Sequence, residues 1–207
     1  MFRFPLAALA VALASPATAA DCTADVLAAF EKQRASKAFR VAMTQPTADG
    51  PVQMTVDYMP PNRMRQTVIG ANMPGEQQTI LIGDRAFAGS DGAFEELLPQ
   101  FTQSIISEVQ AAVGRAPQNL GAFECLGKAS LEGKDLIAYR TLDADAAKNT
   151  PESLARTVYI DPASSLPAFN IVAARSGAGE PVLKATYSYP SDIEIVAPAG
   201  APVQKAN

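Results

Sequence analysis

The sequence predicts a mainly β protein of the α+β class, with a curled antiparallel sheet of about ten or eleven strands and two covering helices. Short runs in which apolar and polar residues alternate recur along most of the chain, as in strands that bury one face. Turn residues separate these runs, and no helix comes between them in the second half, so consecutive strands should pair antiparallel. Two segments have the apolar spacing of an amphipathic helix.

Residues 1–20 are typical of a cleaved signal peptide. Arg3 provides the positive start, residues 4–13 are apolar, and Ala17-Thr18-Ala19 places small residues at the cleavage site. The apolar run is too short for a membrane-spanning helix, which takes about 20 residues. We therefore expect a periplasmic or otherwise exported protein that is soluble after cleavage.

Cys22 and Cys125 are the two cysteines of the chain, and in an exported protein we expect them to form a disulfide. The bond would close a loop of about 100 residues. A reactive thiol pair is the alternative, but the spacing is not CxxC and no group of cations lies beside either residue in the sequence. Lipidation of Cys22 is disfavoured because Asp21 stands where lipidation motifs have a small residue.

The mature chain begins with a helical period over residues 23–37, and the period then changes to that of strands. The first group of strands is predicted at 39–44, 52–58, 63–69, 79–82 and 85–88. A second helix should cover 97–113, introduced by Glu95 and Glu96 and ended by Gly114 and Pro117. The second group of strands is predicted at 123–126, 129–131, 136–142, 156–160, 168–174, 182–188 and 193–196. We expect residues 21–198 to form a single domain and residues 199–207 a flexible tail.

Composition excludes several classes of function. The formal net charge is −4, with Lys+Arg 17 against Asp+Glu 21, so nucleic acid is not an expected partner. The chain contains no His, which removes serine–histidine triads, cysteine–histidine dyads and His-based zinc sites. The acidic residues at 84, 91, 95 and 96 fall in predicted turns or at a helix start rather than in a catalytic pair. We therefore predict neither an enzyme nor a bound cofactor or metal.

Methionine is concentrated in the first group of strands, and Met is a flexible side chain that adapts to ligands of different shape. These residues could fill a core between sheet and helices or line a ligand cavity. The size of the predicted sheet favours the cavity, because Trp is absent and aromatic residues are 7% of the chain. The candidate cavity residues are Phe39, Val41, Met43, Met54, Val56, Tyr58, Met64, Leu98, Phe101 and Ile105. Arg63 and Arg65 are the candidates for the cavity mouth, where they could bind a lipid head group.

A series of short motifs resembles one known family in order and spacing over nearly the whole mature chain. The motifs are Phe39-Arg40-Val41, residues 57–65 (DYMPPNRMR), residues 82–87 (IGDRAF), residues 158–162 (VYIDP) with Leu166-Pro167, and residues 187–198. They resemble the LolA-like superfamily of exported lipoprotein and lipid carriers, which includes LolA, LolB and the LppX/LprG lipid binders. The resemblance implies an incomplete antiparallel β-barrel closed by helices, with an apolar cavity that takes acyl chains. The absence of Trp departs from the LolA pattern.

Two functions are consistent with these expectations. The first is a soluble exported carrier or binding protein for a lipid, a lipoprotein acyl chain or a similar apolar ligand, which works without covalent chemistry and exchanges its ligand with a membrane-associated donor or acceptor protein. The second is a periplasmic sensor or regulatory module on the same architecture, like the RseB-type regulators, which binds a partner protein.

Overall fold

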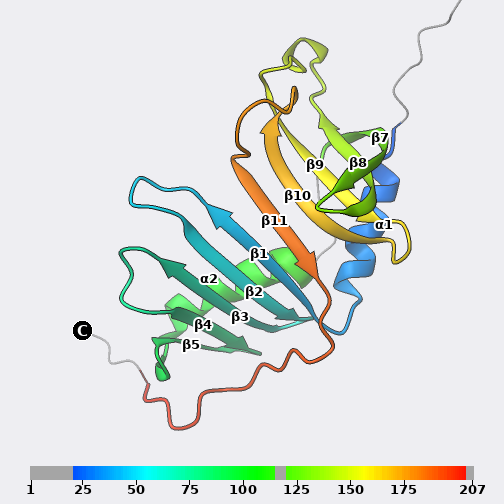
Figure 1. Cartoon of the computed structure of the whole chain (residues 1–207). Helices are drawn as coiled ribbons and strands as arrows, with labels where there is room; N and C mark the ends of the chain where they lie inside the picture. The colour runs from blue at the N-terminus through cyan, green and yellow to red at the C-terminus, as the bar shows by residue number, and fades with distance from the viewer. Residues whose placement is uncertain (1–20, 115–119, 204–207) are drawn as a thin grey trace, which may run out of the picture.

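The structure, a computed structural model, describes residues 21–114 and 120–203. Eleven strands form one antiparallel sheet in the order β6-β5-β4-β3-β2-β1-β11-β10-β9-β8-β7. Each half of the chain forms a meander of sequential neighbours, and the pairing of β1 with β11 joins the two halves (Figure 1). The sheet is strongly curled but open, since β6 and β7 remain as its two edges. The predicted fold class is confirmed.

The strands agree with the predicted alternation in most places. The first half contains β1 (Phe39–Gln45), β2 (Val52–Met59), β3 (Arg63–Gly70), β4 (Gln77–Ile82), β5 (Arg85–Ser90) and β6 (Ala93–Glu96). The second half contains β7 (Ala122–Leu131), β8 (Lys134–Leu142), β9 (Leu154–Asp161), β10 (Leu166–Ala174) and β11 (Leu183–Ser188). The prediction divided β7 into two strands. The structure has one strand here, and it stays paired with β8 on both sides of a register shift between Cys125 and Gly127.

The prediction that Glu95 and Glu96 introduce the second helix is wrong. Both belong to β6, where Glu96 pairs with Phe87 of β5 and accepts hydrogen bonds from the Arg85 guanidinium at 2.8 and 2.6 Å. Helix α2 (Pro99–Val109) begins only at Pro99, which suits a first helical position because it has no N–H to leave unpaired.

The two helices cover the same face of the sheet, which we call the inner face. Helix α1 (Thr23–Arg34) contacts β7, β9 and β10, and its buried residues Val26 and Phe30 form a cluster with Phe123 and Val158. Helix α2 continues into the π-helical turn η1 (Gln110–Gly114). The buried residues of this second helical segment join the core on strands β1–β5 and β11, namely Val109 and Val113 with Val41, Val56, Met64, Leu81, Ala86 and Ala185.

The opposite, outer face of the first half is covered by the segment after β11. Ile193 and Ile195 are buried there together with Ala38, Ile80 and Phe87, and Figure 1 shows the segment passing from the end of β11 toward β5. The strand predicted at 193–196 does not form, because β11 is already paired on both sides, with β1 and with β10. The alternating apolar residues instead pack on an existing sheet.

The segment expected to be a flexible tail continues this packing as far as the structure describes it. Ala201 contacts the outer-face cluster. The Glu96 backbone N–H donates to the Pro202 carbonyl at 2.8 Å, and Val203 forms a parallel bridge with Glu96. Residues 199–203 therefore lie against β6. Residues 204–207 and the predicted signal peptide lie outside the described residues.

The disulfide between Cys22 and Cys125 is present, as predicted, with Cα atoms 5.6 Å apart and a sequence separation of 103. It attaches the start of α1 to β7. Two hydrogen bonds support this junction: the Cys22 N–H donates to the Phe123 carbonyl at 2.9 Å, and the Phe123 N–H donates to the Thr23 hydroxyl at 3.0 Å. No helix in the described ranges is both long and apolar enough to cross a membrane.

Candidate ligand-binding pocket

A pocket of about 260 Å³ lies between the inner face of the sheet, α1 and the turn η1. Its floor is built where the two halves of the sheet meet. Val41 of β1 pairs with Val56 of β2 on one side and with Tyr187 of β11 on the other, so strand alternation points all three side chains to the inner face. The lining residues are Phe30, Gln33, Arg34, Phe39, Val41, Met43, Val56, Tyr58, Ala111, Ala112, Leu120, Arg156 and Tyr187.

Aromatic rings form much of the apolar wall. Phe39 and Tyr58 stack with ring centroids 5.0 Å apart, and Phe30 meets Tyr187 edge-on at 6.3 Å. Burial, with smaller effects of Glu108 and Tyr187, raises the pKa of Tyr58 to about 12. Its hydroxyl is therefore protonated at neutral pH, and this part of the wall carries no charge.

Polar groups gather at the side of the pocket formed by α1, β9 and β11. The Arg156 Nε donates to Asn170 Oδ1 at 2.9 Å, and the guanidinium lies 5.4 Å from the centroid of the Phe30 ring. Burial raises the pKa of Tyr187, although hydrogen bonds with Asn170 and Arg156 oppose the shift. Gln33 is 4% exposed, and its amide nitrogen has no hydrogen bond of good geometry among the described residues, although an interaction with Gln33 acts to lower the pKa of Tyr189.

Five of the predicted cavity residues line this pocket: Phe39, Val41, Met43, Val56 and Tyr58. Met64 is buried in the adjacent core, and Met54 and Ile105 pack against that core from its edge. Leu98 is the residue before α2 and is half-buried. Phe101 was expected to face the sheet, but it is 52% exposed, because the buried positions of α2 are Thr102 and Val109. Neither Leu98 nor Phe101 lines the pocket.

The two arginines predicted at the cavity mouth lie on the outer face of the sheet. Arg63 donates to the Ile195 carbonyl at 3.2 Å. Arg65 donates to the Asp57 carboxylate at 2.7 Å, and Arg40 binds the same carboxylate at 2.6 and 3.0 Å. The physical reason is the strand period: both residues flank Met64, whose side chain is in the inner-face core, so they must point the other way.

The prediction missed the lining residues contributed by α1, η1, β9 and β11. Phe30 lies in the predicted helix 23–37 and Tyr187 in the predicted strand 182–188, so the available signal was the helical period for one and the strand period for the other. Gln33 and Arg156 gave no such signal, because the sequence does not reveal which helical turn meets which strand.

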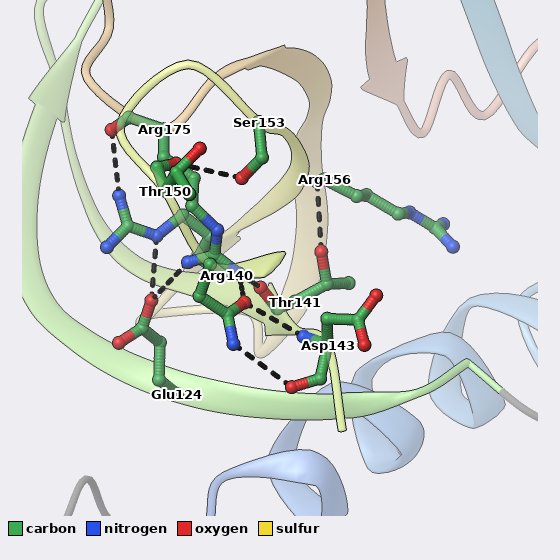
Figure 2. Close-up of polar contacts among 9 residues, drawn as sticks. Glu124, Arg140, Thr141, Asp143, Thr150, Ser153, Arg156 and Arg175 are labelled. Carbon is green, nitrogen blue, oxygen red and sulfur yellow. Dashed lines mark hydrogen bonds and ion pairs between the residues drawn. The ribbon is translucent and has the colours of Figure 1, made fainter. Parts of the chain in front are cut away.

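A second concentration of polar residues lies at the far end of the second half of the sheet and is structural. Figure 2 shows Glu124 bridging Arg140 and Arg175, at 2.8 and 3.1 Å. Arg175 also donates to the Thr141 carbonyl and to the Asn149 side chain, which fixes the β8–β9 connection. The Arg156 guanidinium extends away from this group (Figure 2). No set of three or more acidic or cysteine side chains that could hold a metal ion occurs within the described residues.

No protein-family model and no curated protein matches the sequence, but solved structures match its fold. LprF from Mycobacterium bovis aligns with a TM-score of 0.54 at 14% identity, over 84% of this chain and 96% of that chain. The Mycobacterium tuberculosis lipoprotein LppX aligns with a TM-score of 0.54 at 17% identity, over 84% and 97%. A chain of the Pseudomonas aeruginosa MucA/MucB complex aligns with a TM-score of 0.50 at 10% identity, over 89% of this chain and 64% of that one.

At these identities the similarity establishes the fold alone. The protein has the fold of LppX and LprF, which confirms the architecture implied by the resemblance to the LolA-like superfamily.

Proposed function

We propose that this protein is an exported, non-catalytic carrier or binding protein for a lipid, a lipoprotein acyl chain or a similar apolar ligand. The observation that carries the proposal is the apolar pocket between the inner face and the two helical segments, on a fold shared with the lipoprotein LppX. The ligand class follows from the resemblance to the LolA-like carriers. A membrane-associated donor or acceptor protein would be the partner in exchange.

Burial of apolar surface supplies the affinity in this proposal, at about 25 cal/mol for each Å² removed from water. The pocket volume of about 260 Å³ is slightly below the roughly 300–1,000 Å³ of pockets for drug-sized ligands. It therefore suits a single acyl chain better than a lipid with several chains enclosed at once.

A direct test is native mass spectrometry of the protein purified from an exporting host, followed by titration with a fluorescent fatty acid. We expect a co-purified lipid or saturable binding of the probe. Ala112→Trp, which places a large side chain in the pocket lining, should weaken probe binding at least several-fold. Ala28→Trp is the matched control, because Ala28 is an exposed α1 residue outside the pocket, and it should bind as the unmodified protein does. Absence of both lipid and probe binding would contradict the proposal.

A partner-binding regulatory role is the second candidate, and the fold similarity to a chain of the MucA/MucB complex favours it. An operon neighbour that encodes a membrane-spanning regulator, together with no co-purified lipid, would support this role over that of a carrier. The two roles also differ in their dependence on the pocket. Ala112→Trp should weaken binding of a lipid but leave unchanged the binding of a protein partner that does not use the pocket.

A further inference from the structure

The pocket is asymmetric in charge. The lining residues from β1, β2, β11 and η1 carry no charge, whereas the two charged lining residues, Arg34 and Arg156, come from α1 and β9. Phe30, Gln33 and Arg34 share one side of α1, because residues three and four apart lie on the same helical face. Both charged residues of the lining are arginines, and no acidic residue lines the pocket.

The Gln33 amide does not face the open pocket. Its nitrogen is inaccessible to solvent and has no hydrogen bond of good geometry among the described residues. A side-chain hydrogen bond from Gln33 nevertheless acts to lower the pKa of Tyr189, whose hydroxyl donates to the Pro167 carbonyl at 2.9 Å and can still accept. Gln33 is therefore directed toward Tyr189, and the polar group left for a ligand is an arginine.

Arg156 is a cation without an acidic partner. Its Nε is used by Asn170, and no carboxylate of the described residues forms an ion pair with it, in contrast to Arg40, Arg140 and Arg175. Its guanidinium lies over the Phe30 ring, 5.4 Å from the ring centroid. Arg156 therefore places a charge without an acidic partner on the side of the pocket formed by α1 and β9.

We infer that the pocket binds a single-chain amphiphile with an anionic head group, such as a fatty acid carboxylate. The head group pairs with the Arg156 guanidinium, while the chain lies on Val41, Val56 and Tyr58. This inference rests on the proposed function and names the ligand class. It explains why an otherwise apolar site retains a cation without an acidic partner.

The test compares ligands that differ only in the head group. Dodecanoate, dodecyl phosphate and dodecanol are titrated by calorimetry near neutral pH, below their aggregation limits. We expect an anion to bind about tenfold or more tightly than dodecanol, as for a charge-assisted hydrogen bond. The comparison of the two anions identifies carboxylate or phosphate as the preferred head group.

Substitution of Arg156 assigns the preference to this residue. Arg156→Met should remove most of the preference for the anion while dodecanol binds as before. Arg63→Gln, on the outer face, is the control and should keep the full preference. If Arg156→Met does not fold, Arg156→Gln and the head-group comparison decide.

Equal affinities for the anions and dodecanol would overturn the inference while leaving the proposed function intact. No binding of any of the three would overturn both. An unchanged preference after substitution of Arg156 would overturn the inference by showing that the head group lies elsewhere.

Discussion

Met43 and Met64 occupy different environments on the same face of the sheet. Met43 is partly buried and lines the pocket. Met64 is buried in a cluster with Leu81 of the neighbouring strand β4 and Val109 of helix α2. The same residue type therefore serves as a lining group at one position and as a core group at the other.

Substitution by Gln separates these two roles, because Gln resembles Met in size but adds an amide. Met64→Gln buries that amide without a partner and should lower the free energy of unfolding by about 1–3 kcal/mol. Met43→Gln should cost less stability but weaken binding of a fluorescent fatty acid several-fold. Denaturant melts and titrations of both variants provide the measurement. The reverse pattern would show that the pocket wall has been misplaced.

Asp57 shows how an acid is held on the outer face. It is 2% exposed and lies between Arg40 of β1 and Arg65 of β3, which pair with it across the sheet. Burial alone would raise its pKa, but the hydrogen bonds from Arg40 and Arg65, helped by their charges, more than offset this and lower the pKa below its usual value.

This lowered pKa makes a prediction for acid stability. The ionised carboxylate stabilises the fold above the unfolded-state pKa of about 3.9, and the contribution is lost as the pH falls through the lower folded-state pKa. Asp57→Asn should be less stable than the unmodified protein at neutral pH, and the difference should shrink as the pH falls below about 4. Chemical denaturation at a series of pH values measures it. A difference independent of pH would exclude this linkage.

At the scale of elements, α2 packs through a narrow stripe. Val109 and the following Val113 of η1 are buried in the inner-face core, and Thr102 is buried near the start of the helix. Phe101, the residue before Thr102, is exposed to solvent. The apolar spacing of residues 97–113 predicted the helix, but several apolar residues could have defined its buried side, and Phe101 was the wrong choice.

Paired charge substitutions test this orientation of α2. Val109→Asp places an unpaired charge in the core and should unfold the protein or lower its stability by several kcal/mol. Phe101→Asp should change stability by less than about 1 kcal/mol, since the site is exposed and an acid in the first turn of a helix is favourable. Circular dichroism melts of both variants compare them directly. A large loss for Phe101→Asp would indicate that this side of α2 is covered.

For the whole molecule, strand alternation predicted most of the architecture and the inner-face residues Val41, Val56 and Tyr58, because a period of two residues fixes which side chains share a face. The same rule, applied from Met64, already places Arg63 and Arg65 on the opposite face. The positions of Gln33 and Arg156 depend on how α1 docks on β9 and β10, which is set by tertiary packing and not by local pattern.

The segment after β11 shows where local pattern fails. Ile193 and Ile195 alternate with polar residues as in a strand, but a strand also needs a free edge, and none is available beside β11. The segment instead crosses the outer face, where Ile195 is 1% exposed and Val196 points to solvent. It ends against the edge strand β6.

Because this segment covers the outer face of β4 and β5, it should contribute to the stability of the first half of the sheet. Ile195→Ala removes a buried side chain from the cluster with Ile80 and Phe87 and should lower the free energy of unfolding by about 2–5 kcal/mol. Val196→Ala, at the neighbouring exposed position, should change it by less than about 0.5 kcal/mol. Hydrogen exchange should locate the loss for Ile195→Ala in β4 and β5. If the two variants melted alike, the segment after β11 would be an appendage and not part of the fold.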